Sequence, residues 1–299
     1  MNIKVGNAPV SWGVMEVEGW GEQVPYRKVL DEIVKAGYTG TELGPYGYLP
    51  TEPNELKSEL SARGLQLVAS FVPLPLAHPE RHEAGYQEAM KVAQLLSRSS
   101  AHLIVLADEM SAARMAVSGR VDEARDGMSD SHWDGAAQII RRISEDCREL
   151  GLSAVFHHHA GTFVETPKEI ARLCESTDAD LLGLCLDTGH YLFGGGDPVD
   201  AVRLYGNRIR HLHLKDVQLP VLEAAQRDEV GFLEAVRRGV FCELGEGAVD
   251  LNKVIRDMNA VGYSGWAIVE QDVDTSNPDV KPLESAIRSR QYLQNVIGI

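Results

Sequence analysis

Four short polar clusters each close an apolar stretch of the chain, and they contain most of the side chains that could do chemistry. The clusters lie in AVFHHHAGTFVE, LLGLCLDTGH, IRHLHLKDV and WAIVEQD, and their candidate residues are His157, His159, Glu165, Asp187, His190, His213, Lys215 and Glu270. Imidazoles mixed with carboxylates are typical of sites for divalent ions of borderline hardness, such as Mn²⁺, Co²⁺, Zn²⁺ or Fe²⁺. The sequence therefore predicts a metal-dependent enzyme.

The spacing within the clusters indicates which side chains share a face. Side chains alternate along a strand, so His157 points the same way as His159, and His213 the same way as Lys215. Such a run at a strand end fits only the polar mouth of a barrel. Asp187 closes an apolar run and needs a partner, which a metal, an arginine or the start of the next helix could provide.

Two weaker candidates lie nearer the start of the chain. Glu42 closes the second expected strand and could bind a substrate hydroxyl, although a structural hydrogen bond explains it equally well. Trp12 follows the first expected strand and could stack on the face of a sugar or belong to the core.

The elements that must position these residues alternate along the whole chain. Apolar or β-branched runs predict strands near 3–8, 38–43, 65–72, 101–107, 152–158, 181–187, 208–214 and 265–270. Amphipathic stretches predict helices near 22–36, 51–63, 82–97, 130–150, 166–176, 197–206, 249–261 and 279–296. Glycine recurs where a helix gives way to a strand, as expected of a helix C-cap.

Eight strand–helix units in a chain of 299 residues predict one (β/α)8 barrel domain covering 1–299. The alternative, a doubly wound open sheet, is disfavoured because no G-x-G-x-x-G follows the first strand. Two long connections, after the fourth and seventh strands at 108–129 and 216–248, are expected to form lids or substrate walls.

Composition limits the classes of partner. The chain has 29 basic and 44 acidic residues and a net charge of −15, which argues against a nucleic-acid partner. Apolar runs are too short for a membrane helix, and the start of the chain shows no secretion signal, so we expect a cytoplasmic protein acting on a small molecule. The sequence leaves open whether the chain forms a homo-oligomer.

Several motifs resemble a known family. The eight-unit layout with His or acid after strands five to eight resembles the xylose-isomerase-like TIM-barrel superfamily. NAPVSWGV, FHHHAGT, LDTGHYLFGGGDP, IRHLHLKD, FLEAVRRGVFCELGEGAVD and the closing GYSGWAIVEQDVD resemble the inosose dehydratases, which dehydrate 2-keto-myo-inositol in inositol catabolism. The resemblance runs over nearly the whole chain.

This resemblance implies a metal-dependent carbon–oxygen lyase. It assigns the ion, Mn²⁺ or Co²⁺ first and Zn²⁺, Fe²⁺ or Mg²⁺ as alternatives, to Asp187, His213, Glu270 and either Glu165 or a neighbouring histidine, His157 or His159. The expected reaction eliminates water from a keto-inositol through a metal-stabilised enolate.

Roles for the remaining side chains follow from that chemistry. We expect His159 and His190 as acid and base, Lys215 to hold an oxyanion or hydroxyl, and Glu42, His157 and Trp12 to bind substrate. The alternative is an epimerase or isomerase of keto-sugars on the same metal site.

Overall fold

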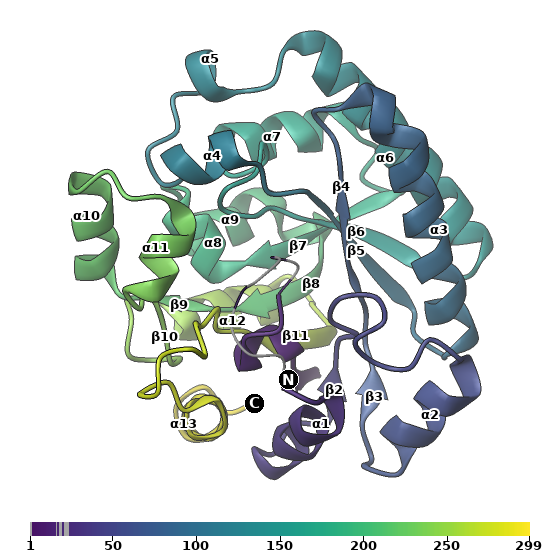
Figure 1. Cartoon of the computed structure of the whole chain (residues 1–299), viewed down its shortest axis with the longest axis vertical. Coiled ribbons are helices and arrows are strands. Elements are labelled where there is room, and N and C mark those ends of the chain that lie inside the picture. Colours follow the sequence, from purple (N-terminus) through teal and green to yellow (C-terminus); the bar gives the residue numbers. More distant parts are fainter. Residues whose placement is uncertain (1, 16, 18–19, 21–23) are drawn as a thin grey trace.

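Strands and helices alternate along the chain in the computed structural model, which describes residues 2–15, 17, 20 and 24–299 (Figure 1). Nine strands form a parallel sheet in the order β3-β2-β1-β11-β8-β7-β6-β5-β4. They are β1 (Ile3–Asn7), β2 (Gly40–Thr41), β3 (Gln66–Leu67), β4 (Phe71–Leu74), β5 (Leu103–Asp108), β6 (Ser153–His157), β7 (Leu182–Asp187), β8 (Ile209–Leu214) and β11 (Gly265–Val269).

The sheet closes on itself at the third strand position. β3 pairs with β2 and β4 pairs with β5, while only residues 68–70 separate β3 from β4 along the chain. Within that break, Val68 N–H donates to the Thr41 carbonyl at 2.9 Å, and Val105 N–H donates to the Ser70 carbonyl at 3.0 Å. The expected (β/α)8 barrel is confirmed, and its third strand is interrupted.

Helices surround the barrel, and each barrel helix falls within about four residues of its expected bounds. They are α1 (Tyr26–Lys35), α2 (Pro53–Ser61), α3 (His82–Arg98), α6 (Asp130–Glu149), α7 (Pro167–Ser176), α9 (Pro198–Tyr205), α12 (Leu251–Ala260) and α13 (Pro282–Tyr292). Short 3₁₀ turns lie at Pro9–Trp12, Pro79–Arg81 and Gly206–Arg208, and a π-helical turn at Leu293–Ile297. Gly37 and Gly151, after α1 and α6, have φ of 91° and 78°, the left-handed conformation expected of C-cap glycines.

The barrel interior changes from apolar to polar over two residues. Val155, Cys185 and Ile268 belong to a buried apolar cluster inside the sheet. Two residues further along the same strands come His157, Asp187 and Glu270, all buried. Because side chains alternate along a strand, each polar residue points the same way as the apolar residue two positions before it. The strands therefore carry the polar groups to the carboxyl-terminal mouth of the barrel.

The two long connections contain additional elements. The first holds α4 (Ala112–Val117) and α5 (Glu123–Asp126), and the second holds β9 (Asp216–Val217), α10 (Leu219–Arg227), α11 (Phe232–Arg237) and β10 (Phe241–Cys242). β9 and β10 pair antiparallel. Phe232 and Phe241 join Phe193 of α8 (Thr188–Phe193) in a second apolar cluster outside the barrel core. These connections therefore pack as structured layers over one side of the mouth.

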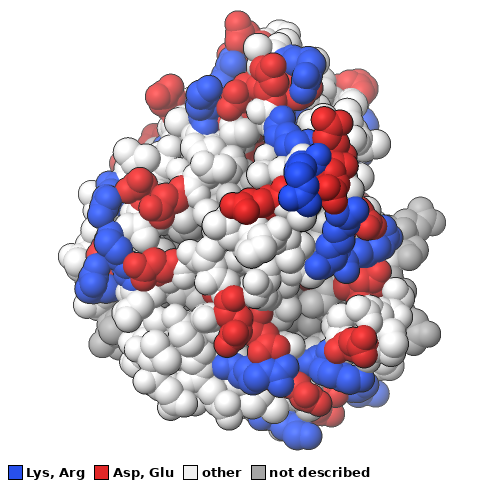
Figure 2. Space-filling model, turned by 90° about the vertical axis from the view of Figure 1, so that its left-hand side faces the viewer, with Lys and Arg blue, Asp and Glu red and all other residues white. Residues whose placement is uncertain are grey.

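The surface carries charges of both signs. On the face in Figure 2, lysine and arginine side chains are interspersed with acidic ones, and uncharged areas lie between them. Among the described residues, no helix is both long enough and apolar enough to cross a bilayer.

Candidate metal centre and active site

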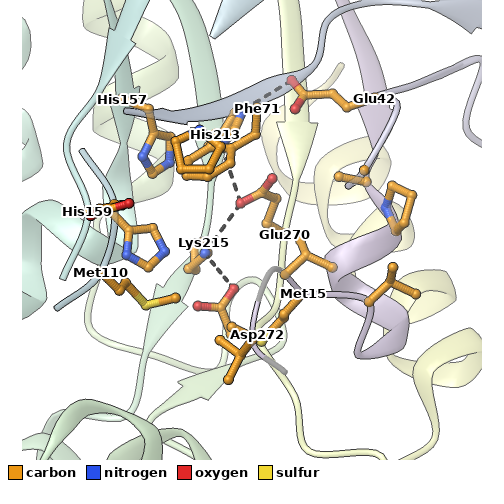
Figure 3. Close-up of a pocket in the computed structure, with 18 of the residues that line it drawn as sticks. Met15, Glu42, Phe71, Met110, His157, His159, His213, Lys215, Glu270 and Asp272 are labelled. Atoms are coloured by element: carbon orange, nitrogen blue, oxygen red, sulfur yellow. Dashed lines mark hydrogen bonds and ion pairs between the residues drawn. The ribbon is translucent and has the colours of Figure 1, made fainter. Parts of the chain in front are cut away.

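A cavity of about 390 Å³ opens at the carboxyl ends of the strands (Figure 3). Its floor holds polar side chains from β6, β8 and the ends of β2 and β11, namely Glu42, His157, His159, His213, Lys215, Glu270 and Asp272. Its walls are largely apolar. Met15 comes from the connection after β1, and Met110 and Met115 come from the first long connection. The expectation that this connection supplies a wall agrees with its position, whereas no described residue of the second long connection lines the cavity.

Four of the buried polar residues bring one ligand atom each to a common point. His157, Asp187, His213 and Glu270 offer nitrogen or oxygen atoms that all lie within 4.8 Å of one another. His157 Nε2 lies 3.5 Å from Asp187 Oδ2, and His213 Nδ1 lies 3.2 Å from Glu270 Oε2. Two imidazoles and two carboxylates suit a borderline divalent ion.

Asp187 uses its two oxygens differently. Oδ1 accepts the backbone N–H of His190 at 2.8 Å and so caps α8. Oδ2 is buried and has no hydrogen-bond partner among the described residues. Burial alone would raise the pKa of Asp187, but the charges of Lys215 and His190 hold it well below its usual value. The cap expected from the sequence and a free, ionised oxygen are thus present in one side chain.

His213 is oriented from behind by a carboxylate. Its Nε2 lies 3.1 Å from Glu42 Oε1, and His211 Nε2 lies 2.7 Å from the same oxygen. His213 Nδ1 is therefore the nitrogen that faces Glu270 and Asp187, at 3.2 and 3.9 Å from their oxygens. This arrangement, in which a carboxylate fixes the ring of a ligand histidine, is common around protein metals. Glu42 lines the cavity as well, so both of its expected roles are compatible with its position.

Lys215 is buried among three carboxylates. Its Nζ lies 2.7 Å from Asp272 Oδ1, 3.3 Å from Glu270 Oε2 and 3.5 Å from Asp187 Oδ2. Burial alone would lower the pKa of Lys215, but these carboxylates raise it above its usual value. The side chain is therefore a fixed ammonium on the cavity floor.

His159 and His190 lie beside each other, with ring centroids 3.8 Å apart. His159 lines the cavity, and its Nδ1 lies 2.7 Å from the Ala160 carbonyl. A carbonyl only accepts, so Nδ1 carries the proton and Nε2 keeps the lone pair. His190 is fully buried in α8, with Nε2 3.0 Å from Lys215 Nζ, and it does not line the cavity. His190 lies within helix α8, which begins directly after its cap Asp187.

Two other expected site residues lie elsewhere. Glu165 accepts the N–H groups of Gly119 and Gly161 at 2.6 and 2.7 Å and the hydroxyl of Ser118 at 2.9 Å, so its carboxylate is occupied away from the four ligand atoms. The structure thus brings His157, the alternative, to the cluster instead. Trp12 donates its indole N–H to Glu32 at 2.6 Å, is 1% exposed and does not line the cavity.

Two buried acids on the cavity were not expected. Asp272 lies two residues after Glu270, the same spacing that pairs His157 with His159 and His213 with Lys215, so strand alternation could have identified it. Asp108 closes β5 as Asp187 closes β7. It accepts the N–H groups of Phe163 and Leu76 at 2.8 and 3.2 Å, and burial raises its pKa to about 7.

Known proteins share this architecture. The sequence profile of xylose isomerase-like TIM barrels matches residues 30–296. An inosose dehydratase of Lacticaseibacillus casei is 32% identical over 100% of this chain and 99% of its own length. Two solved structures superpose closely. A probable 3-DHS dehydratase of Bacillus anthracis has a TM-score of 0.72 at 16% identity, covering 98% of this chain and 100% of that one. A protein solved with a bound zinc atom has a TM-score of 0.70 at 15% identity, covering 99% and 98%.

The chain forms a barrel with a polar site at its strand ends, lined by His, Asp and Glu. Together with the profile match, this makes the protein a xylose isomerase-like TIM barrel. Within that class, the chain is similar over its full length to an inosose dehydratase at 32% identity. The chain belongs to the inosose dehydratase family.

Proposed function

We propose that this protein is a metal-dependent dehydratase that eliminates water from a keto-inositol such as 2-keto-myo-inositol. The observation that carries the proposal is the convergence of one ligand atom each from His157, Asp187, His213 and Glu270 within 4.8 Å. His157, His213 and Glu270 line the floor of a cavity that also holds Lys215 and His159. The end-to-end similarity to an inosose dehydratase supports the choice of substrate class.

The residues present fit a divalent ion. Asp187 Oδ2 and His213 Nδ1 are both buried, face each other at 3.9 Å and lack hydrogen-bond partners among the described residues. Leaving such atoms unsatisfied is costly, and an ion would satisfy both. Asp187, His213, Glu270 and His157 would hold it. When bound, it would act as a Lewis acid toward the substrate ketone.

The chain's own groups account for the proton transfers of an elimination. The α-proton of a ketone needs an acceptor, and His159 offers Nε2 because its Nδ1 donates to the Ala160 carbonyl. Removal of that proton places negative charge on the ketone oxygen, and the Lys215 ammonium is positioned on the same floor to stabilise it. The departing hydroxyl must leave as water, and the proton that His159 has taken from the carbon next to the ketone can be transferred to it, which returns the imidazole to its starting state. His190 contacts Lys215 from behind and so acts as a positioning residue.

A metal-stripped and metal-restored assay tests the proposal. Protein treated with EDTA is compared with protein given Mn²⁺ or Co²⁺, with 2-keto-myo-inositol as substrate and ultraviolet absorbance of the dione product as readout. The proposal expects absorbance to grow only with metal.

The same samples are followed by NMR for solvent deuterium at the carbon next to the ketone. Exchange or inversion without loss of water would favour the epimerase alternative. Folded, metal-loaded protein that shows neither reaction would contradict the assignment of the substrate class.

A further inference from the structure

A second cavity, of about 820 Å³, opens at the opposite end of the barrel from the catalytic one. It lies at the amino-terminal ends of the strands, where it is lined by Lys4 of β1, Gln66 of β3, Leu103 of β5, Ser153 of β6, Arg210 of β8 and Trp266 of β11. None of the groups that the proposed elimination uses lines it. It therefore has no role in the reaction described above.

The charge of this cavity is opposite to that of the chain. Lys4, Lys57 and Arg210 line it, and no aspartate or glutamate is found among its described lining residues, although the chain has a net charge of −15. None of the three cations forms an ion pair with a described residue. Arg210 donates to the Ala179 carbonyl at 2.6 Å, and Lys4 contacts the neutral amide oxygen of Gln66 at 3.4 Å. The cavity thus concentrates positive charge that the surrounding protein does not neutralise.

Hydroxyl groups supplement these cations. Five serines line the cavity, namely Ser61, Ser99, Ser100, Ser153 and Ser264. Ser99 is only 6% exposed, and its Oγ is buried without a hydrogen-bond partner among the described residues. A buried hydroxyl in that state costs stability unless something enters to bond it.

We propose that this amino-terminal cavity binds a phosphate-type anion, either free phosphate or the phosphoryl group of a small metabolite. Arginine and lysine without counter-charges, together with hydroxyl donors, are the groups that recognise a tetrahedral oxyanion. The absence of carboxylates among the described lining residues makes the cavity unsuitable for a hard cation such as Ca²⁺ or Mg²⁺. Its volume leaves room for more than a phosphate ion, which is why a phosphorylated metabolite is included.

The cavity also touches the hydrogen bonds that orient the candidate metal ligand. His211 lines it, and His211 Nε2 lies 2.7 Å from Glu42 Oε1, the oxygen that is 3.1 Å from His213 Nε2. An anion bound here would therefore lie at one end of a short chain of polar contacts that ends at the catalytic floor.

Calorimetric titration of the full-length protein tests the site, with inorganic phosphate and glucose 6-phosphate as probes at constant ionic strength. We expect one site per chain, with affinity about tenfold lower in Lys57→Gln and in Arg210→Gln. Ser99→Ala should weaken binding without lowering Tm, because its hydroxyl has no partner to lose. The tighter of the two probes identifies whether free phosphate or a phosphorylated metabolite is preferred.

Two control variants locate the binding. Arg203→Gln removes a cation on α9 that is paired with Asp200 and lies outside the cavity, and it should bind as the wild type does. Asp187→Asn disables the candidate metal centre and should also bind normally. Failure of both probes to bind, unchanged affinity in both Lys57→Gln and Arg210→Gln, or loss of binding in Asp187→Asn would overturn the proposal.

Discussion

Asp187 combines a structural and a chemical role in one side chain, and a conservative change separates them. In Asp187→Asn the amide oxygen can still cap α8, since asparagine is as good an N-cap as aspartate. The charge that would hold a metal is lost. We expect metal content to fall to background and turnover to fall by more than the roughly 100-fold that loss of an outer-shell partner costs. Elemental analysis and the dehydration assay measure both.

Asp197→Asn is the matched control because Asp197 caps α9 in the same way but lies outside the metal cluster. It should keep metal and turnover. Full metal content in Asp187→Asn would remove Asp187 from the ligand set.

Of the three carboxylates that contact the Lys215 ammonium, that of Asp272 is the nearest, at 2.7 Å. Asp272→Asn keeps the size of the side chain but removes the charge, so the ammonium should shift toward Glu270 and Asp187. Because a displacement of about 1 Å can cost up to roughly 100-fold in rate, we expect a lower kcat with little change in KM. Asp274→Asn, two residues further on and paired with Arg237, is the control. An equal fall in both variants would indicate a general structural effect instead.

Site residues at strand ends could be predicted from the sequence, whereas the position of a candidate residue in a loop could not. His157, Asp187, His213 and Glu270 lie at or directly after the ends of strands whose apolar runs are clear, and alternation fixes their direction. Glu165 lies eight residues beyond the end of β6, where the path of the chain depends on Ser118 and the backbone of Gly119 and Gly161. Ser118 and Gly119 are 47 and 46 residues away in sequence and leave no local signal.

At the scale of elements, a buried ion pair fastens the first long connection to the barrel. Arg114 of α4 contacts both oxygens of Glu169 in α7 at 2.9 Å, and both side chains are at most 5% exposed. Arg114→Met would leave the carboxylate buried without its cation, which costs about 3–5 kcal/mol. We expect a lower free energy of unfolding and faster hydrogen exchange over residues 111–127. The control is Arg125→Met, because Arg125 pairs with Asp126 at the surface. Unchanged exchange in Arg114→Met would contradict this anchoring role.

Asp108 connects three parts of the barrel. It is the last residue of β5, and its carboxylate accepts the N–H of Leu76, which follows β4, and the N–H of Phe163, which follows β6. Burial raises its pKa to about 7 from 3.8, so the folded state binds a proton in a range where the unfolded state does not. The free energy of unfolding should therefore rise as pH falls from about 7 toward 4, and the cost of burying the charge is fully present above pH 7. Denaturant titrations of wild type and Asp108→Asn measure this contribution. Equal slopes against pH in the two proteins would rule it out.

The elements themselves were predictable where periodicity was strong. Each of the eight strands and eight barrel helices lies close to its expected range, because apolar alternation and helical amphipathicity are local properties. The break between β3 and β4 was not predicted, since it arises where one segment must pair with β2 and then with β5 to close the barrel. Helix α8 was missed because it is only six residues long and begins at a cap that also serves the candidate site.

For the whole molecule, the centre at the barrel mouth gathers more negative than positive charge in a chain that is already acidic. Asp187, Glu270 and Asp272 surround the Lys215 ammonium, and Glu42 adds a fourth carboxylate behind His213. Carboxylates buried this close repel one another, so a bound divalent cation should stabilise the folded state well beyond its local contacts.

Metal at about 100 times its Kd would stabilise the folded state by about 2.7 kcal/mol. For a chain of 299 residues that corresponds to a rise in Tm of about 4 °C, given a typical unfolding entropy per residue. Calorimetry of EDTA-treated protein with and without Mn²⁺ measures the shift. Asp187→Asn should show none, and Asp197→Asn should match the wild type. An equal rise in Asp187→Asn would mean that the ion binds elsewhere on the acidic surface, because only the centre at the barrel mouth depends on that carboxylate.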